Sequence, residues 1–242
     1  MKYKGFIIFA VLVCTVVALL GVGALFRGGL DAPASSKNSG EQTLDAFESI
    51  DIDVKSADII LEEGEQFAIT YRLHDQEKIK RLEVEDGTLH FDTSIDFKWK
   101  PTYDKWSITL TIPKGAPLHT LKLETVAGEI EIADRSFQQG YFETTAGEIV
   151  AKGLHCEKLT LKTVSEDVHL VNSEVIQEVD IQTVSGAIEA LVPVSTIHAE
   201  SVGAIYLNGE AQGRRLFLEG EGPTLRAKSV SGTIEINNAT AV

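Results

Sequence analysis

Hydrophobic and polar residues alternate along most of the chain beyond residue 43. Clear examples are "IDIDV" (50–54), "RLEVEDGTLHF" (81–91), "SITLTI" (107–112) and "LKLET" (121–125). Side chains of a strand point alternately to its two faces, so this period of two predicts strands with one buried face. Residues 74–80 (HDQEKIK) break the pattern, and we interpret them as one short helical turn. The sequence therefore predicts an all-β domain.

The second half of this domain repeats one phrase: "TVAGEIEI" begins at Thr125 and "TTAGEIVA" at Thr144. Three columns of equivalent residues recur every 17–20 positions. The first is polar: Thr125, Thr144, Thr163, Thr183, Ser201 and Gly220. The second, two residues earlier, is apolar: Leu123, Phe142, Leu161, Ile181, Ala199 and Leu218. The third, after the bend, is also apolar: Ile130, Ile149, Val168, Ile188, Ile205 and Leu225.

A repeat of this length is typical of a β-solenoid, in which each coil stacks on the last at about 4.8 Å. We therefore predict a single-stranded β-solenoid with 19–20-residue coils over residues 43–242, regular in 118–242 and less regular in 43–117. Residues 43–117 either continue the solenoid, which we favour, or form a small antiparallel cap. We expect residues 227–236 to be a partial coil that closes the stack.

Glycine marks the bend of the phrase at Gly128, Gly147 and Gly186. Glycine adopts positive φ without steric cost and allows stacked backbones to approach closely. Glu166, Gly203 and Pro223 take its place in the other units. Threonine favours strands, and we expect its stacked hydroxyls to hydrogen-bond along the ladder. These repeat corners are interpreted as structural.

The N-terminal region is a hydrophobic segment without a charge, residues 6–26 (FIIFAVLVCTVVALLGVGALF). About 20 apolar residues suffice for a helix to cross a bilayer. Lys2 and Lys4 precede it, which places residues 1–5 in the cytoplasm and the rest of the chain outside. We predict a single-pass transmembrane helix at the cell membrane, then a flexible extracytoplasmic linker over 27–42. The alternative is a cleaved signal peptide with a processing site near residues 22–24.

The chain has a formal net charge of −14. All of the acidic residues lie beyond residue 30. An exported domain of this charge should repel nucleic acid and anionic lipid. Cys156 is the one cysteine beyond the hydrophobic segment. An intrachain disulfide within the domain is therefore excluded, and its stability must come from packing and repetition.

The order of these segments resembles a known family. The relevant stretches are "FESIDIDVKSADIILEEG", "RLEVEDGTLHFD" and "SITLTIPKGAPLHTLKLETVAGEIEI", followed by the T-x-x-G-x-I units. They resemble the bacterial putative adhesin domain family of unknown function, which includes membrane-anchored proteins of Gram-positive envelope-stress operons. The resemblance covers residues 43–242 and includes the "IPKG" step. It implies a β-solenoid at the bacterial cell surface and supplies no catalytic or binding residue.

Motifs for chemistry are scarce. The six histidines lack paired metal spacing, and the sequence has no Walker loop, dinucleotide fingerprint or G-x-S-x-G. Glu129, Glu148 and Asp167 follow the glycine column and should stack about 4.8 Å apart. Such a ladder could hold Ca²⁺ or imitate the carboxylates of polysaccharide-cleaving enzymes, but we favour carboxylates directed into water. We expect no catalytic residue, cofactor or metal.

One aromatic and basic stretch, "KWKPTYDKW" (98–106), contains both tryptophans. Pro101 argues against a central strand, so we expect a hairpin loop or an edge. Trp and Tyr beside Lys could stack on sugars or lie at lipid headgroups, and the alternative that we favour is a cap over the open end of the core. The candidate binding residues are Lys98, Trp99, Lys100, Tyr103, Lys105 and Trp106.

From these features we predict a non-catalytic, membrane-anchored surface protein whose solenoid is an interaction platform, either an adhesin or an envelope-stress accessory protein. Its partner would be an envelope polymer or another protein. The alternatives are a small enzyme acting on envelope polysaccharide and a self-assembling surface component, because unpaired strands at a solenoid end invite stacking. We considered the C-terminal segment 233–242 as such an end, since it carries few charges.

Overall fold

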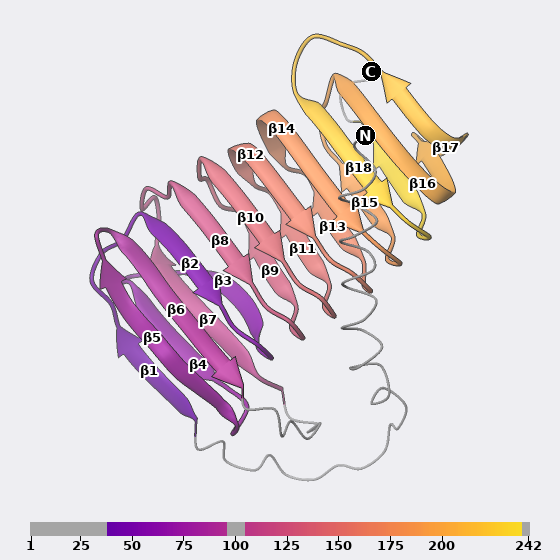
Figure 1. Cartoon of the computed structure of the whole chain (residues 1–242). Coiled ribbons are helices and arrows are strands. Elements are labelled where there is room, and N and C mark those ends of the chain that lie inside the picture. Colours follow the sequence, from indigo (N-terminus) through magenta and orange to yellow (C-terminus); the bar gives the residue numbers. More distant parts are fainter. Residues whose placement is uncertain (1–37, 96–104, 239–242) are drawn as a thin grey trace. The chain divides into compact units, whose positions relative to one another are not determined.

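The computed structural model describes residues 38–95 and 105–238, and all of the regular structure in these ranges is β. The strands form one 19-stranded sheet that turns back on itself, with each coil contributing a strand to each of two faces. Figure 1 shows the coils stacked from the end that carries β1 and β5 to the end that carries β16 and β17. The all-β prediction is confirmed. The predicted helix over 6–26 lies outside the described residues.

Along the first face the strands pair in the order β5 (Glu77–Glu85), β6 (Thr88–Ile95), β2 (Ser49–Asp53), β8 (Thr120–Glu124), β10 (Gln139–Glu143), β12 (His155–Lys162), β14 (Glu174–Thr183), β18 (Thr224–Ser229), β16 (Thr196–Leu207) and β17 (Glu210–Leu218). Along the second face the order is β1 (Ser39–Thr43), β4 (Ala68–Arg72), β7 (Ser107–Pro113), β3 (Asp58–Gly64), β9 (Ile130–Ala133), β11 (Ile149–Lys152), β13 (Val168–Val171), β15 (Ile188–Leu191), β19 (Ile234–Asn237) and the end of β16.

The core lies between the two faces and consists of stacked apolar columns. On the first face one column contains Phe91, Ile52, Leu123, Phe142, Leu161, Ile181, Ala227 and Ala199. Opposite it lie Ile108, Ile59, Ile130, Ile149, Val168, Ile188, Ile234 and Ile205. All of these side chains are buried. A single coil could not bury them, so stacking supplies the hydrophobic stabilisation.

Chain order and spatial order differ at both ends of the stack. The coil of β2 and β3 lies between the coil of β6 and β7 and that of β8 and β9. Near the other end, the coil of β18 and β19 lies between β14–β15 and β16. β2 and β3 (49–64), and β6 and β7, are therefore coils of the same stack, while β1, β4 and β5 pair antiparallel at its end.

This order corrects the C-terminal part of the predicted columns. Ser229 pairs with both Thr183 and Ser201, and Leu225 belongs to the first face beside Val179. Gly220 is not in the polar column, because the chain reverses at Asn208–Gly209 and β17 runs antiparallel to β16. The coil at 227–236 does not close the stack, and β19 within 233–242 is paired on both sides rather than open.

The ends of the stack are formed by antiparallel hairpins. Asp86–Gly87 connects β5 to β6 and Asn208–Gly209 connects β16 to β17, all four residues having positive φ. Such Asp-Gly and Asn-Gly pairs are the favoured residues of two-residue hairpin turns. The helical turn predicted for residues 74–80 is wrong: a turn at Asp75 and Gln76 leads directly into β5. The alternation of polar and apolar residues in β5 was not recognised in the sequence because its lysines make the segment look uniformly charged.

No helix among residues 38–95 and 105–238 has the length and apolar character needed to cross a membrane.

Candidate functional site

The T-x-x-G phrase forms the corner between the two faces, and its threonines stabilise the stacking. The hydroxyl of Thr144 donates to the carbonyl oxygen of Gly128 at 2.9 Å, and that of Thr163 donates to Gly147 at 2.9 Å. Thr125, Thr183, Ser229 and Ser201 make the equivalent bond to the neighbouring coil. The hydroxyls thus hydrogen-bond along the ladder, and their acceptors are backbone carbonyls of the neighbouring coil.

The glycine column is required by close approach of the backbones. A Cβ atom built on Gly147 would lie 1.8 Å from the oxygen of Gly128, and one on Gly186 would lie 1.7 Å from the oxygen of Glu166. Neither glycine has positive φ, so that part of the explanation was wrong. Positive φ occurs instead at the opposite corner, at Asp134, Gly153 and Asn172. The corner phrase is scaffold.

The acidic side chains after the glycine column lie along one edge of the stack. Glu129, Glu148 and Asp167 occupy successive coils, since each precedes a member of the paired column Ile130, Ile149 and Val168. Asp58 extends this row, because β3 pairs directly with β9. The sequence did not reveal Asp58, whose coil is distant in chain order. We name Asp58, Glu129, Glu148, Glu166 and Asp167 the acidic corner; four of them, without Asp167, line a depression of about 280 Å³.

Charge accumulates at this corner. Partial burial, and then the carboxylates of Asp58 and Glu148, raise the pKa of Glu129 above its ordinary value, and Lys105 opposes this. Both aspartates of the acidic corner accept hydrogen bonds from backbone amides: Asp58 from Glu129 at 2.9 Å, and Asp167 from Ala187 at 2.6 Å. Across the described ranges, no three His, Cys, Asp or Glu side chains are grouped so that they could hold a metal ion.

The second predicted site falls mostly outside the described residues, namely Lys98, Trp99, Lys100 and Tyr103. Lys105 is exposed and acts electrostatically on Glu129, so this one residue of the second candidate region lies near the acidic corner. Trp106 is 8% exposed and belongs to the core. Its ring lies 5.4 Å from that of His74, and the Arg72 guanidinium lies 5.6 Å from it. Trp106 therefore packs under the end of the stack.

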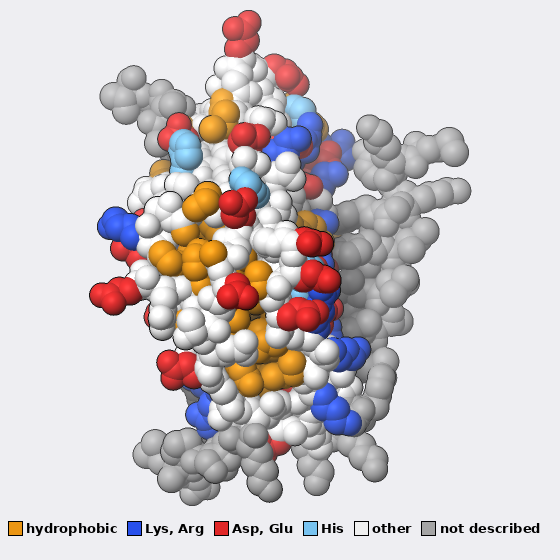
Figure 2. Space-filling view, turned by 90° about the vertical axis from the view of Figure 1, so that its left-hand side faces the viewer, with side chains coloured by type: hydrophobic (Ala, Val, Ile, Leu, Met, Phe, Trp, Pro, Cys, Tyr) orange, Lys and Arg blue, Asp and Glu red, His pale blue; other side chains and the backbone are white. Residues whose placement is uncertain are grey.

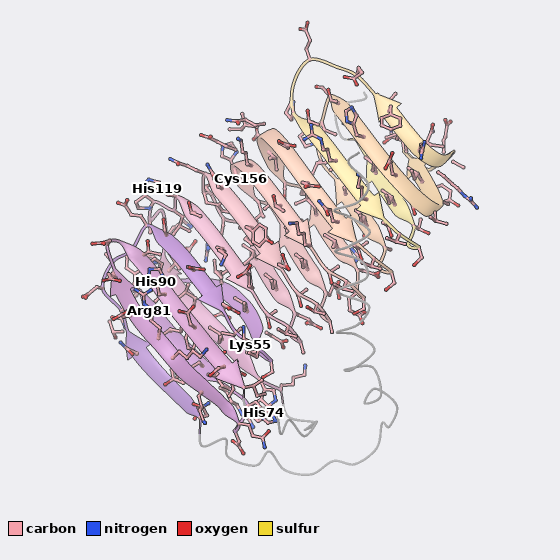
Figure 3. All side chains as sticks on the ribbon, in the orientation of Figure 1. Lys55, His74, Arg81, His90, His119 and Cys156 are labelled. Atoms are coloured by element: carbon pink, nitrogen blue, oxygen red, sulfur yellow. The ribbon has the colours of Figure 1, made fainter. Side chains whose placement is uncertain are left out.

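The corner beside this tryptophan is built around a buried carboxylate. Glu77 is 1% exposed and accepts hydrogen bonds from the Lys55 amide at 2.8 Å, the Ser56 hydroxyl at 2.6 Å and the Thr93 hydroxyl. Three donors satisfy its oxygens, which makes its burial tolerable. Figure 3 shows Lys55 and His74 toward the same edge of the stack, the edge opposite to His119. Glu77 thus holds the segment at Lys55 and Ser56 against β6 through Thr93.

The six histidines lie beside carboxylates or in the core. His169 is 3.2 Å from Glu148 and 2.8 Å from Glu189, on neighbouring coils. Other pairs are His90–Asp51, His119–Glu48, His155–Glu174 and His198–Glu219. Five of the six thus pair with carboxylates on the outer surface, and the pairs of His90, His155 and His169 join neighbouring strands, which is a structural use of histidine.

The end of the stack at β1, β4 and β5 has a mixed surface. Figure 2, viewed from the side on which these strands lie in Figure 1, shows apolar side chains gathered among acidic ones. Half-buried apolar residues of β4 and β5 are Tyr71, Ile79, Leu82 and Val84, which pack against the core. At the opposite end, Phe217 and Leu218 of β17 are 56% and 40% exposed.

Comparison with solved structures identifies proteins of the same fold. A "putative adhesin" from Bacteroides fragilis is 18% identical, with a TM-score of 0.50, over 84% of this chain and 98% of that one. A "putative cell adhesion protein" from Clostridium sporogenes is 14% identical, with a TM-score of 0.41, over 83% and 99% of the two chains. The first similarity supports the fold. No curated protein matches the chain.

A family model matches residues 47–242, which include all of the coils described above. Its extent agrees with the range over which the sequence resembled a surface-protein family of unknown function. The chain belongs to the Toastrack DUF4097 family.

Proposed function

We propose that this chain is a non-catalytic, membrane-anchored cell-surface protein whose β-solenoid serves as an interaction platform. Residues 6–26 would anchor it, residues 27–42 would provide reach, and the stacked coils would present stiff, repetitive faces to an envelope polymer or protein. The observation that supports this role is the pair of continuous apolar columns, which run through every coil and make the stack a single packed body. Adhesion or an accessory role in envelope-stress signalling are specific forms of this function.

To test this, the full chain is expressed with a C-terminal epitope in a bacterial host, and the location of the epitope is measured. We expect the epitope in the membrane fraction and its removal by protease added to intact cells. A Val13→Lys/Val17→Lys variant is the control, because charges within the segment strongly disfavour insertion. An epitope that stays soluble or protected in the wild-type chain would exclude the anchored, outward-facing arrangement. Envelope components captured by the detergent-solubilised chain would then identify the partner.

Self-association is a second candidate, favoured by β17. Among the described strands it pairs with β16 alone, and it carries the exposed Phe217 and Leu218. An unpaired edge can accept a strand from another molecule, although Arg214 and Arg215 are charges of the kind that discourage such pairing. Sedimentation of wild-type and Phe217→Ser/Leu218→Ser chains in the same detergent tests this. Equal monomeric sedimentation would exclude it.

A further inference from the structure

The "IPKG" segment has a topological role. Strand β7 ends at Pro113 and β8 begins at Thr120, yet the coil of β2 and β3 lies between them. Residues 114–119 must therefore pass the corner of that intervening coil. Ala116 donates its amide to the Pro113 carbonyl at 3.1 Å, and His119 donates its amide to the Glu48 carbonyl at 2.6 Å. We call residues 114–119 the crossing loop.

A pocket lies between the crossing loop and the next corner of the stack. Its volume is about 700 Å³, and its walls include Lys114, Ala116 and His119 of the loop and Asp134, Arg135 and Phe137 of the corner. Small-molecule sites commonly measure about 300–1,000 Å³. Ile112, Leu118 and Phe137 add apolar surface. Figure 3 shows His119 of the pocket at the edge of the stack opposite to Lys55. Lys55 shortly precedes β3, which begins at Asp58 of the acidic corner, so the pocket and the acidic corner lie at opposite edges.

Arg135 is the unusual group in this pocket. Its side chain is 11% exposed, and its Nη1 lies 4.0 Å from Glu63 Oε2. Nη1 also donates to the Asp134 carbonyl at 3.3 Å. Its Nε is closed to solvent and has no hydrogen-bond partner among the described residues. A guanidinium has five N–H donors, and burying one with so few acceptors costs free energy that an added acceptor would recover.

The other charged residues of the pocket leave the cationic groups of Lys114 and Arg135 available to a ligand. Lys114 Nζ lies 3.4 Å from Glu63 Oε1, so a single carboxylate serves both Lys114 and Arg135. Asp134 lies against the neighbouring corner, since a Cβ on Gly153 would be 2.2 Å from its Oδ1. His119 and His155 each have a carboxylate partner outside the pocket lining, Glu48 at 3.3 Å and Glu174 at 3.2 Å.

We infer that this pocket binds a small organic anion, whose carboxylate or phosphate pairs with Arg135 and Lys114 and whose carbon skeleton lies against the apolar wall. A planar guanidinium suits either oxyanion, because it can donate two parallel hydrogen bonds. The carboxylates of the acidic corner repel the same ligand, so the ligand is restricted to the edge of the stack that carries the crossing loop. The inference goes beyond the platform function and does not depend on membrane anchoring.

The experiment is calorimetric titration of the full chain in a neutral polyoxyethylene detergent, with three probes that share one ring: glucose 6-phosphate, glucuronate and glucose. We expect at least one anion to bind and glucose not to bind. Arg135→Met should weaken binding about tenfold or more, as expected for loss of a hydrogen bond to a charged group. Arg226→Met is the matched control, because Arg226 pairs with Glu178 on the outer surface between β14 and β18.

Lys114→Met keeps the test decisive if Arg135→Met does not fold, since the Lys114 side chain is 85% exposed and its loss leaves the core intact. We expect it to weaken binding about threefold or more. The preferred anion, phosphate or carboxylate, identifies the class of ligand. The inference is overturned if neither anion binds, if glucose binds equally well, or if neither pocket variant changes the affinity.

Discussion

The hydroxyl of Thr144 and the carbonyl of Gly128 are joined by a 2.9 Å hydrogen bond between neighbouring coils. Thr144 is 1% exposed, so water cannot replace its hydroxyl if it is removed. The same bond recurs at each T-x-x-G corner from Thr125 to Ser201. The corner sequence is thereby explained by a contact between two coils rather than by any property of one coil.

Thr144→Val should remove this bond and retain the shape of the side chain. We expect the free energy of unfolding to fall by about 1–2 kcal/mol, because the Gly128 carbonyl is left with fewer donors in a buried place. Denaturant titration of the full chain measures this. Thr160→Val, on the outer surface of β12, is the control and should change stability by less than about 0.5 kcal/mol. Equal effects would refute the role of the corner bond.

Gly147→Ala should be more disruptive, because its methyl group would lie 1.8 Å from the Gly128 oxygen. Separating the two coils to relieve this contact should cost at least about 2 kcal/mol. Gly115→Ala provides the comparison: it has positive φ but no atom within 4 Å of the added carbon, and should cost about 1 kcal/mol. Thermal melting of both variants checks this order, and a milder effect at Gly147 would contradict it.

Glu77→Ala should destabilise the end of the stack by about 2–3 kcal/mol, because three donors lose a buried carboxylate. Glu83→Ala is the matched control on the same strand. Its carboxylate pairs with Arg81 on the surface, where such pairs contribute little. Chemical denaturation followed by tryptophan fluorescence suits the measurement, since Trp106 lies beside this corner. A loss at Glu83 as large as that at Glu77 would argue against the proposed role.

Glu129→Gln should stabilise the protein slightly near pH 7, by a few tenths of a kcal/mol, since the site is exposed and screened. The pKa of Glu129 is raised in the folded state, so the fold binds this proton more tightly than the unfolded chain does. The stabilisation from the neutral carboxyl is present below the unfolded pKa and is lost as pH rises through the folded pKa.

The gain from Glu129→Gln should therefore shrink as the pH falls through the raised pKa of the folded state, and it should be lost below the ordinary value of 4.5. Melting curves of both proteins at pH 4 and pH 7 test this dependence, and added salt should reduce the difference at pH 7. Glu221→Gln, on an exposed loop outside the acidic corner, is the control and should not show it. A gain that grew toward low pH would reverse the assigned sign.

The sequence predicted the strands and the core columns where repetition was regular. Ile130, Ile149, Val168 and Ile188 stack as expected because consecutive coils there are also neighbours in space. Prediction failed where the chain leaves that order. Asp58 joins the acidic corner only because β3 pairs with β9, and no local pattern encodes that pairing. Gly220 was misplaced because the Asn208–Gly209 hairpin signal was not recognised.

The site residues were harder to predict for a related reason. Arg135 lies between two exposed polar neighbours and has no motif around it; its environment arises where the crossing loop meets the next corner. Trp106 was named as a candidate binding residue beside lysines, although a cap over the end of the core was the interpretation that we favoured; its ring lies in the core beside His74. The left-handed residues Asp134, Gly153 and Asn172 were visible in principle, because they recur at the repeat period with residue types that tolerate positive φ.

The insertion of one coil between two others also determines how the protein would respond to tension. A pull on the N-terminal side first meets β1, an edge strand, and then β2, which is held by β6 on one side and β8 on the other. A pull from the C-terminal side meets β19, held by β15 and β16. Beyond β1, which pairs with β4 alone among the described strands, neither end can unravel coil by coil from an open edge. Extraction of β2 or β19 must shear two interfaces at once, which would suit the tethered role that we propose.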